Sequence, residues 1–187
     1  MTTMGRHKRN SRRPVQMSAI DKPVVLVGMM GVGKTSIGRK LAERLGLPFA
    51  DADEEIELAA GLSVAEIFER FGEPYFRDGE RRVIARLIEG RPKVIATGGG
   101  AFINDETREL ILNATHSIWL DADVDILVER VSRRGHRPLL VGRDPREVLV
   151  ELGRTRGPIY ALAQIHTRSD TSPHNMTVDN IMKALFP

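Results

Sequence analysis

The chain has 187 residues, of which 41% are hydrophobic and 28% are charged, with 17 glycines, 10 prolines and no cysteine. This length fits one compact α/β domain, and the apolar fraction excludes a chain that is disordered throughout. The lack of cysteine excludes a disulfide framework, a thiolate metal site and a cysteine nucleophile.

No segment has the length and composition of a membrane anchor or a secretory signal. The longest apolar run, residues 24–33, is far shorter than the roughly 20 residues that span a bilayer. Residues 1–20 hold basic and polar residues where a signal peptide would have an apolar stretch. We therefore expect a soluble cytoplasmic protein that makes no membrane contact.

The net charge of +3 comes from the first 20 residues, which carry five basic residues and no acidic one. Residues 21–187 hold 23 basic and 25 acidic residues, a net charge of −2, and give no reason to expect nucleic-acid binding. We interpret residues 1–20 as a disordered leader and residues 21–187 as a single domain. The alternatives are that the leader binds RNA or that translation begins at Met17.

Short apolar segments alternate with helical patterns through the rest of the chain. Val24–Val27 is a continuous β-branched run that ends in glycine, which is typical of a strand buried on both faces. Further strand candidates lie at residues 48–50, 94–97, 117–120 and 165–167. Helical patterns lie at residues 35–45, 63–70, 75–89, 104–113, 123–133, 145–163 and 178–186. This alternation predicts a parallel sheet with ligands at the carboxyl ends of its strands, just after Val27, Ala50 and Thr97.

A complete phosphate-binding motif follows the first strand. The sequence Gly28-Met29-Met30-Gly31-Val32-Gly33-Lys34-Thr35 matches G-x-x-x-x-G-K-[ST] and stands between a strand and a helix. Its glycines let backbone N–H groups surround phosphate oxygens at a helix N-terminus. Lys34 would reach the β- and γ-phosphates, and the Thr35 hydroxyl would hold Mg²⁺. The alternative is a tight glycine turn with a surface lysine, but the complete motif predicts a nucleoside-triphosphate site.

Two aspartates, Asp51 and Asp53, follow the second predicted strand. We expect an extended segment there, in which residues i and i+2 point the same way, roughly 7 Å apart. One carboxylate would then serve a metal ion and the other a substrate hydroxyl, as phosphoryl transfer requires. The alternative is an acidic helix start capped by Asp51 or Asp53, and we prefer this interpretation for Glu54 and Glu55.

Two arginines fall on apolar helical stripes. Arg77 shares a stripe with Ile84 and Ile88, and Arg156 shares one with Leu149. A guanidinium on a buried face needs an anion, and its planar shape suits a carboxylate. An internal glutamate or a path to solvent would satisfy either arginine equally well. Together the two arginines indicate an anionic second substrate.

Residues 132–147 lose helical periodicity and carry five arginines and two prolines. The segment is either an exposed loop or a lid that closes over phosphates, supplies an arginine and excludes water. A kinase must prevent transfer of its phosphoryl group to water, so we favour the lid in a chain with a phosphate loop.

The ordered motifs of the chain resemble those of shikimate kinases, within the nucleoside-monophosphate-kinase-like P-loop folds. The resemblance extends from residue 23 to about residue 170. It rests on residues 28–35, Asp51-x-Asp53 with Ile56-Glu57, and residues 61–68, 72–77, 98–101, 137–140 and 156–160. It implies a three-layer α/β/α fold with a five-stranded parallel sheet, in a single P-loop kinase domain that is monomeric.

The resemblance also implies a set of site residues. The ATP-binding residues would be Gly31, Val32, Gly33, Lys34, Thr35, Ser36, Arg130 and Arg137. The shikimate-binding residues would be Asp53, Arg77, Gly98, Gly99, Gly100 and Arg156, and the Mg²⁺ ligands Thr35 and Asp51. The implied catalytic residues are Asp53, which orients the 3-hydroxyl and acts as base, with Lys34 and the lid residue Arg137 on the phosphates. One departure is the loop at residues 171–175, which lacks the arginine that many relatives carry beside the adenine.

These roles imply transfer of the ATP γ-phosphoryl group to the 3-hydroxyl of shikimate, in chorismate and aromatic amino-acid synthesis. The partners would be the two small substrates and Mg²⁺, without nucleic acid. The nearest enzyme alternative is a gluconate-type kinase, which the aspartate pair, the glycine triplet and the two arginines argue against. An alternative from another class is a non-catalytic ATP-binding regulator whose leader binds nucleic acid.

Overall fold

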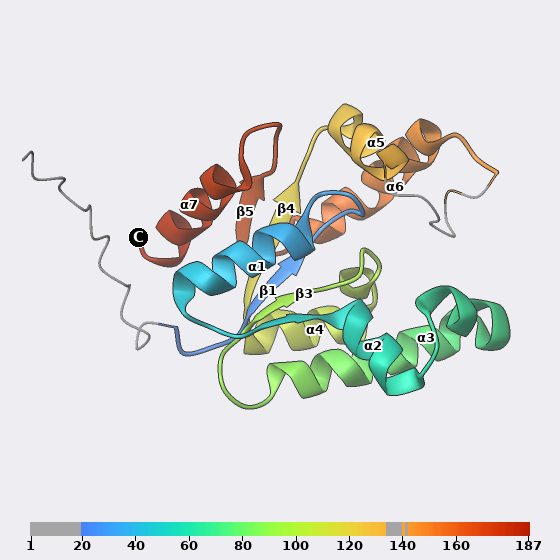
Figure 1. The fold of residues 1–187 in the computed structure, drawn as a ribbon, viewed down its shortest axis with the longest axis horizontal. Coiled ribbons are helices and arrows are strands. Elements are labelled where there is room, and N and C mark those ends of the chain that lie inside the picture. The colour runs from blue at the N-terminus through green and yellow to red at the C-terminus, as the bar shows by residue number, and fades with distance from the viewer. Residues whose placement is uncertain (1–19, 134–139, 141) are drawn as a thin grey trace, which may run out of the picture.

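A computed structural model describes residues 20–133, 140 and 142–187 of the chain. Its centre is a five-stranded sheet in which every paired strand runs parallel to its neighbour (Figure 1). The strands are β1 (Val24–Val27), β2 (Phe49–Asp51), β3 (Val94–Ala96), β4 (His116–Asp121) and β5 (Ile165–Arg168). This arrangement confirms the predicted parallel sheet, and the strand ends differ from the predicted ones by one residue at most.

The order of the strands, β2-β3-β1-β4-β5, places β1 at the centre. All four residues of β1 have no exposed surface, as expected for a strand covered on both faces. The chain leaves β1 toward β2 on one side of the sheet and returns later to β4 on the other. Ligands of such sheets bind beyond the strand ends where the order diverges, so the loops after β1, β2 and β3 define the region of interest.

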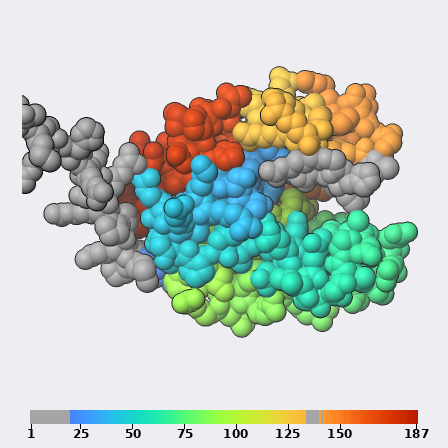
Figure 2. Space-filling view, in the orientation of Figure 1, coloured from blue at the N-terminus to red at the C-terminus, as the bar shows by residue number. Residues whose placement is uncertain are grey.

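Helices cover both faces of this sheet and complete three layers (Figure 1). The helices are α1 (Lys34–Leu45), α2 (Ala52–Ala60), α3 (Val64–Ile88), α4 (Asp105–Ala114), α5 (Val124–Arg133), α6 (Pro145–Tyr160) and α7 (His174–Leu185). Helices α1 and α7 pack together on one face, and α3 and α4 pack together on the other. In the space-filling view, α2–α3 and α5–α6 form two projections at the same end of the molecule (Figure 2).

Three helices differ from the sequence expectation by more than one residue. Helix α2 was weighed only as the alternative at Asp51, because it buries just Ala52 and Ile56 and shows no extended apolar stripe. Helix α7 begins at His174, four residues earlier than the apolar pattern indicates, because its first turn is mostly polar. Helix α6 ends at Tyr160 rather than at residue 163.

Helix α3 contains the break that the sequence pattern predicts between residues 70 and 75. Gly72 has φ 79° and ψ 174°, outside the helical region, and Pro74 follows it. Ser63 and Glu66 begin the helix with a reciprocal capping box. After the break, α3 packs against α4, and Arg81 in its second half pairs with Glu106 of α4 at 3.2 Å.

Two predicted segments fall wholly or partly outside the described residues. They are the leader and the centre of the basic segment 132–147, including Arg137. Within the described ranges, no helix combines the length and hydrophobicity needed to cross a bilayer.

Candidate active site

The loop after β1 has the backbone that a phosphate-binding loop requires. Gly28, Gly31 and Gly33 all have positive φ angles, with Gly33 at 101° as the N-cap of α1. A methyl group on Gly28 would lie 2.3 Å from the carbonyl oxygen of Leu120, so only glycine fits there. The loop therefore turns tightly between the central strand and the N-terminus of α1, where the helix dipole favours anions.

Lys34 is the first residue of α1, and only 9% of its surface is exposed. Its Nζ donates hydrogen bonds to the carbonyl oxygens of Gly28 at 2.7 Å and Met29 at 2.8 Å. The ammonium group thus lies inside the loop that precedes it. A cavity opens beside it, lined by Met30, Gly31, Gly33, Lys34, Thr35, Asp51, Asp53, Thr97, Gly98 and Gly99.

Thr35 and Asp51 bring two oxygen donors together at this cavity. The Thr35 hydroxyl donates to Oδ2 of Asp51 at 2.7 Å. Mg²⁺ prefers oxygen ligands and in nucleotide sites uses one or two protein groups besides phosphate oxygens and water. Neither His nor Cys is part of this pair, and among the described residues no three or more acidic, His or Cys side chains are grouped so that they could hold a metal ion by themselves. The donor set therefore fits a magnesium ion held jointly with a nucleotide.

The predicted extended geometry of Asp51 and Asp53 is wrong. Asp51 ends β2, but the chain turns there into α2, and Asp53 lies in the first helical turn. Asp51 is the N-cap, because its Oδ1 accepts the N–H of Asp53 at 3.0 Å. The helix-cap interpretation is therefore correct for Asp51, although both aspartates still line the same cavity.

Glu54 and Glu55 lie on the outer side of that first turn. Glu54 pairs with Arg39 at 3.0 Å and Glu55 with Arg86 at 2.9 Å, both at the protein surface. Their interpretation as a solvated acidic helix start is confirmed. The ion pairs link α2 to α1 and α3.

The glycine triplet after β3 forms a floor against which the predicted substrate residues lie. A methyl group on Gly98 would lie 2.9 Å from Oδ1 of Asp53, and one on Gly100 would lie 2.3 Å from Nη2 of Arg77. On Gly99 it would lie 3.4 Å from the Met30 nitrogen of the phosphate loop. Gly98 and Gly100 therefore leave room for Asp53 and Arg77, whereas a methyl group on Gly99 would make only an ordinary contact.

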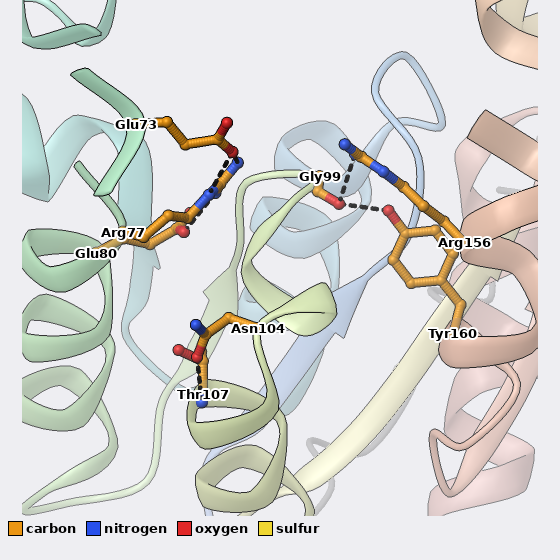
Figure 3. Close-up of polar contacts among 8 residues, drawn as sticks. All are labelled: Glu73, Arg77, Glu80, Gly99, Asn104, Thr107, Arg156 and Tyr160. Atoms are coloured by element: carbon orange, nitrogen blue, oxygen red, sulfur yellow. Dashed lines mark hydrogen bonds and ion pairs between the residues drawn. The ribbon is translucent and has the colours of Figure 1, made fainter. Parts of the chain in front are cut away.

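Arg77 approaches this floor from α3 and is paired with a buried carboxylate (Figure 3). Its Nη1 lies 2.6 Å from Oε2 of Glu80, a residue that is only 1% exposed. Burial raises the pKa of Glu80, and the charge of Arg77 offsets only part of this effect. The other oxygen, Oε1, has no hydrogen-bond partner among the described residues and lies 3.0 Å from the methyl position of Gly98.

The stripe argument for Arg77 is borne out by exposure along α3. Its side chain is 22% exposed, whereas those of Arg81, Arg82 and Arg86 are 39%, 65% and 59% exposed. The internal glutamate weighed as an alternative is also present. Glu80 and Arg77 therefore form one unit in which the arginine has a structural partner and still borders the glycine floor.

Arg156 approaches the floor from the opposite side, on α6 (Figure 3). Its Nη1 donates to the carbonyl oxygen of Gly99 at 3.3 Å. The hydroxyl of Tyr160, one turn further along α6, donates to the same carbonyl oxygen. The two arginines thus face each other across residues 98–100, as a clamp on an anionic group would require.

A second cavity adjoins the outer side of the phosphate loop. It is lined by Gly31, Gly33, Ser36, Arg130, Arg133 and His174. Arg130 is held there by hydrogen bonds to the Val32 carbonyl at 3.0 Å, the Ser169 hydroxyl at 3.1 Å and the Asp170 carbonyl at 2.6 Å. His174, which lies in residues 171–175 and begins α7, completes the lining of this cavity.

Sequence reasoning missed two residues of this site, Glu80 and Tyr160. Glu80 lies three residues after Arg77 and four before Ile84, so it is an acidic residue on the same apolar stripe. Tyr160 lies four residues after Arg156, on the same helical face. In both cases, a polar residue three or four positions after an arginine on a buried helical face could have indicated a residue of the site.

The chain is similar in sequence to shikimate kinases. A family model described as shikimate kinase matches residues 30–186. A shikimate kinase of Caulobacter vibrioides is 58% identical over 164 residues, covering 88% of this chain and 82% of its own. One of Zymomonas mobilis is 54% identical over 168 residues, covering 90% and 96%.

Solved structures agree with the sequence relatives. A shikimate kinase from Acinetobacter baumannii in complex with shikimate superposes with a TM-score of 0.85 at 34% identity, covering 89% of this chain and 94% of its own. A gluconokinase from Sinorhizobium meliloti gives a TM-score of 0.57 at 18% identity, covering 89% and 92%. The gluconokinase therefore shares the fold alone.

Proposed function

The chain belongs to the shikimate kinase family, and we propose that the cleft beside its phosphate loop transfers the γ-phosphoryl group of ATP to the 3-hydroxyl of shikimate. In this reaction the 3-oxygen forms a bond to the γ-phosphorus, and the bond from that phosphorus to the β-phosphate bridging oxygen breaks. ADP leaves, and the hydroxyl proton passes to a base. The observation that carries the assignment is the convergence of Asp53, Arg77 and Arg156 on residues 98–100, directly beside the phosphate loop.

Binding of the acceptor would use both sides of the glycine floor. We assign the shikimate carboxylate to Arg77 and Arg156, because guanidinium groups on facing helices suit a planar anion. The ring would lie against residues 98–100, which Asp53 and Arg77 approach closely. This placement brings the hydroxyl groups toward Asp53 and the phosphate loop.

Binding of ATP would use the loop from Gly31 to Gly33 with Lys34, Thr35 and Ser36, and Arg130 beside the adenine. Lys34 has to exchange its bonds to the Gly28 and Met29 carbonyls for phosphate oxygens. Thr35 and Asp51 would hold Mg²⁺, which neutralises charge on the phosphates when it is bound.

Asp53 is our candidate for the base at the 3-hydroxyl. It lines the same cavity as Lys34 and lies next to Gly98, which supports a position between acceptor and donor. A carboxylate in this position orients the hydroxyl and accepts its proton as the new bond forms. We also retain Arg137, in the lid proposed for residues 132–147, as the residue that contacts the transferring group and excludes water.

The test is a coupled assay of ADP release with purified protein, ATP and Mg²⁺. Turnover should depend on shikimate, and gluconate at the same concentration should give none. Removal of Mg²⁺ by chelation should abolish turnover, and added Mg²⁺ should restore it. The assignment would be refuted if well-folded protein released ADP with gluconate in place of shikimate. It would also be refuted if neither compound supported ADP release.

Three further expectations are proposals of the same kind. We propose that residues 21–187 form one kinase domain, that the enzyme is monomeric and that it acts in the cytoplasm, where ATP is available. The domain proposal is supported by the family match, which extends almost to the end of the chain. Size-exclusion chromatography with light scattering would test the oligomeric state, and an N-terminal deletion of residues 1–16 that keeps full activity would support an accessory leader.

A further inference from the structure

Tyr160 is a buried polar residue to which the proposed reaction assigns no role. Its side chain is among the largest fully buried ones, with 1% of its surface exposed. Its hydroxyl donates to the carbonyl oxygen of Gly99, in the middle of the glycine floor (Figure 3). The chain has one other tyrosine, Tyr75, which lies on α3 and is 54% exposed.

The direction of the Tyr160 hydroxyl is fixed by packing of its ring. The ring stacks against Trp119 of β4, with ring centroids 6.1 Å apart and planes inclined by 29°. Trp119 in turn borders the start of the phosphate loop, since its Cδ1 would lie 3.3 Å from a methyl group on Gly28. The tyrosine ring therefore cannot turn away from Gly99 without disturbing the central strands.

Gly99 lies between α6 and the phosphate loop. Its carbonyl oxygen accepts from both Arg156 and Tyr160, which uses the two lone pairs of the oxygen. Because C=O and N–H point in opposite directions across a trans peptide, a carbonyl held toward α6 aims the Gly100 N–H toward the side from which Arg77 approaches (Figure 3).

We propose that Tyr160 is a positioning residue for the acceptor substrate, acting through the Gly99–Gly100 peptide. When Arg156 turns to the substrate carboxylate, the Tyr160 hydroxyl is the contact that keeps this peptide in its orientation. Burial raises the pKa of Tyr160, so the hydroxyl stays protonated and remains a donor across the working pH range. The inference deepens the proposed function and rests on it.

The test compares Tyr160→Phe with the matched control Tyr75→Phe. Both changes remove one hydroxyl and keep the ring, so the stack on Trp119 is retained in Tyr160→Phe. In Tyr160→Phe, the KM and the calorimetric Kd for shikimate should rise about threefold to tenfold, the range expected for one lost hydrogen bond. The KM for ATP should stay at the wild-type value, and Tyr75→Phe should change neither.

The outcomes separate this inference from the function on which it rests. Wild-type protein that does not bind shikimate would overturn both. Wild-type binding with an unchanged shikimate Kd in Tyr160→Phe would overturn the positioning role alone. Equal losses of ATP and shikimate affinity, or a lowered melting temperature with unchanged shikimate affinity, would also overturn it, because they would indicate a general structural role.

A measurement on the unmutated protein keeps the inference testable if Tyr160→Phe does not fold. Incorporation of 3-fluorotyrosine labels both tyrosines, and Tyr75→Phe identifies the remaining fluorine resonance as that of Tyr160. Added shikimate should shift the Tyr160 resonance and leave that of Tyr75 in place. A Tyr160 resonance that does not respond to saturating shikimate would overturn the proposal.

Discussion

Replacement of Arg77 by alanine should affect stability and substrate binding through two separable effects. The change leaves the Glu80 carboxylate buried, at 1% exposure, without its partner at 2.6 Å. Removal of one partner from a buried ion pair typically costs about 3–5 kcal/mol. In a domain of this size that loss lowers the melting temperature by roughly 6–20 °C.

The loss of stability in Arg77→Ala should depend on pH. Because burial raises the pKa of Glu80 in the folded protein, the folded state binds a proton that the unfolded chain has already released. Stability therefore falls as pH rises from the unfolded pKa through the folded one. Loss of Arg77 removes the largest influence that lowers the pKa of Glu80. The folded pKa then rises further, so the pH range over which stability falls extends to higher pH. The deficit should be small in mild acid and largest at about pH 8.

A second substitution distinguishes the two effects. Glu80→Met removes the buried carboxylate at similar volume, so Arg77→Ala/Glu80→Met should recover most of the lost stability and lose the pH dependence. It should not recover shikimate binding, which we expect to be weaker by tens- to thousands-fold, about 2–5 kcal/mol, in both variants. Urea denaturation at several pH values and calorimetric titration with shikimate measure the two quantities.

The matched control is Arg82→Ala on the same helix. Arg82 is 65% exposed and pairs with a half-exposed aspartate, so its loss should change stability by about 1 kcal/mol or less. If Arg77→Ala is no less stable than Arg82→Ala at pH 8, or if its deficit does not vary with pH, the buried-pair reasoning is refuted. Normal shikimate affinity in the stabilised double variant would show that Arg77 does not bind the shikimate carboxylate.

Three further predictions concern the rest of the site. Arg156→Ala should weaken shikimate binding at least about 30-fold. It should lower the free energy of unfolding by only about 1 kcal/mol, because Tyr160 still holds Gly99. Calorimetric titration and urea denaturation measure the two quantities, and a large loss of stability would contradict this prediction. Asp53→Asn should lower kcat by about 10²- to 10⁴-fold with little change in the KM for ATP; steady-state kinetics with a near-normal kcat would exclude Asp53 as the base. In Gly100→Ala the new methyl group would lie 2.3 Å from Nη2 of Arg77 and should sharply reduce shikimate affinity. The control Gly153→Ala, in α6 with no atom within 4 Å of its methyl position, should keep normal affinity and gain about 0.5–1 kcal/mol of stability; equal effects in the two would show that contact with Arg77 is not the cause.

The sequence alone determined those features that depend on neighbours along the chain. The phosphate loop is recognisable because a buried strand, a glycine turn, a lysine and a helix start must follow one another within a dozen residues. Strands β1 and β3 were predictable because a strand covered on both faces is continuously apolar, as VVLV and VIA are. The stripe position of Arg77 and Arg156 was equally readable, since helical periodicity places them on buried faces before any contact is known.

Only the tertiary structure decided how these parts meet. The turn at Asp51 into α2 carries little periodic signal, because a nine-residue helix with two buried residues is held mainly by its contacts with β2 and α3. The pairing of Arg77 with Glu80 was possible from spacing, but the tertiary structure brings the buried Glu80 carboxylate next to Gly98, after β3. The bond from Tyr160 to Gly99 joins residues 61 positions apart, which no local pattern reports. Contacts of this kind arise when a parallel sheet brings distant loops to one edge. The sequence motifs therefore indicate the chemistry, whereas the tertiary structure determines which residues meet in the site.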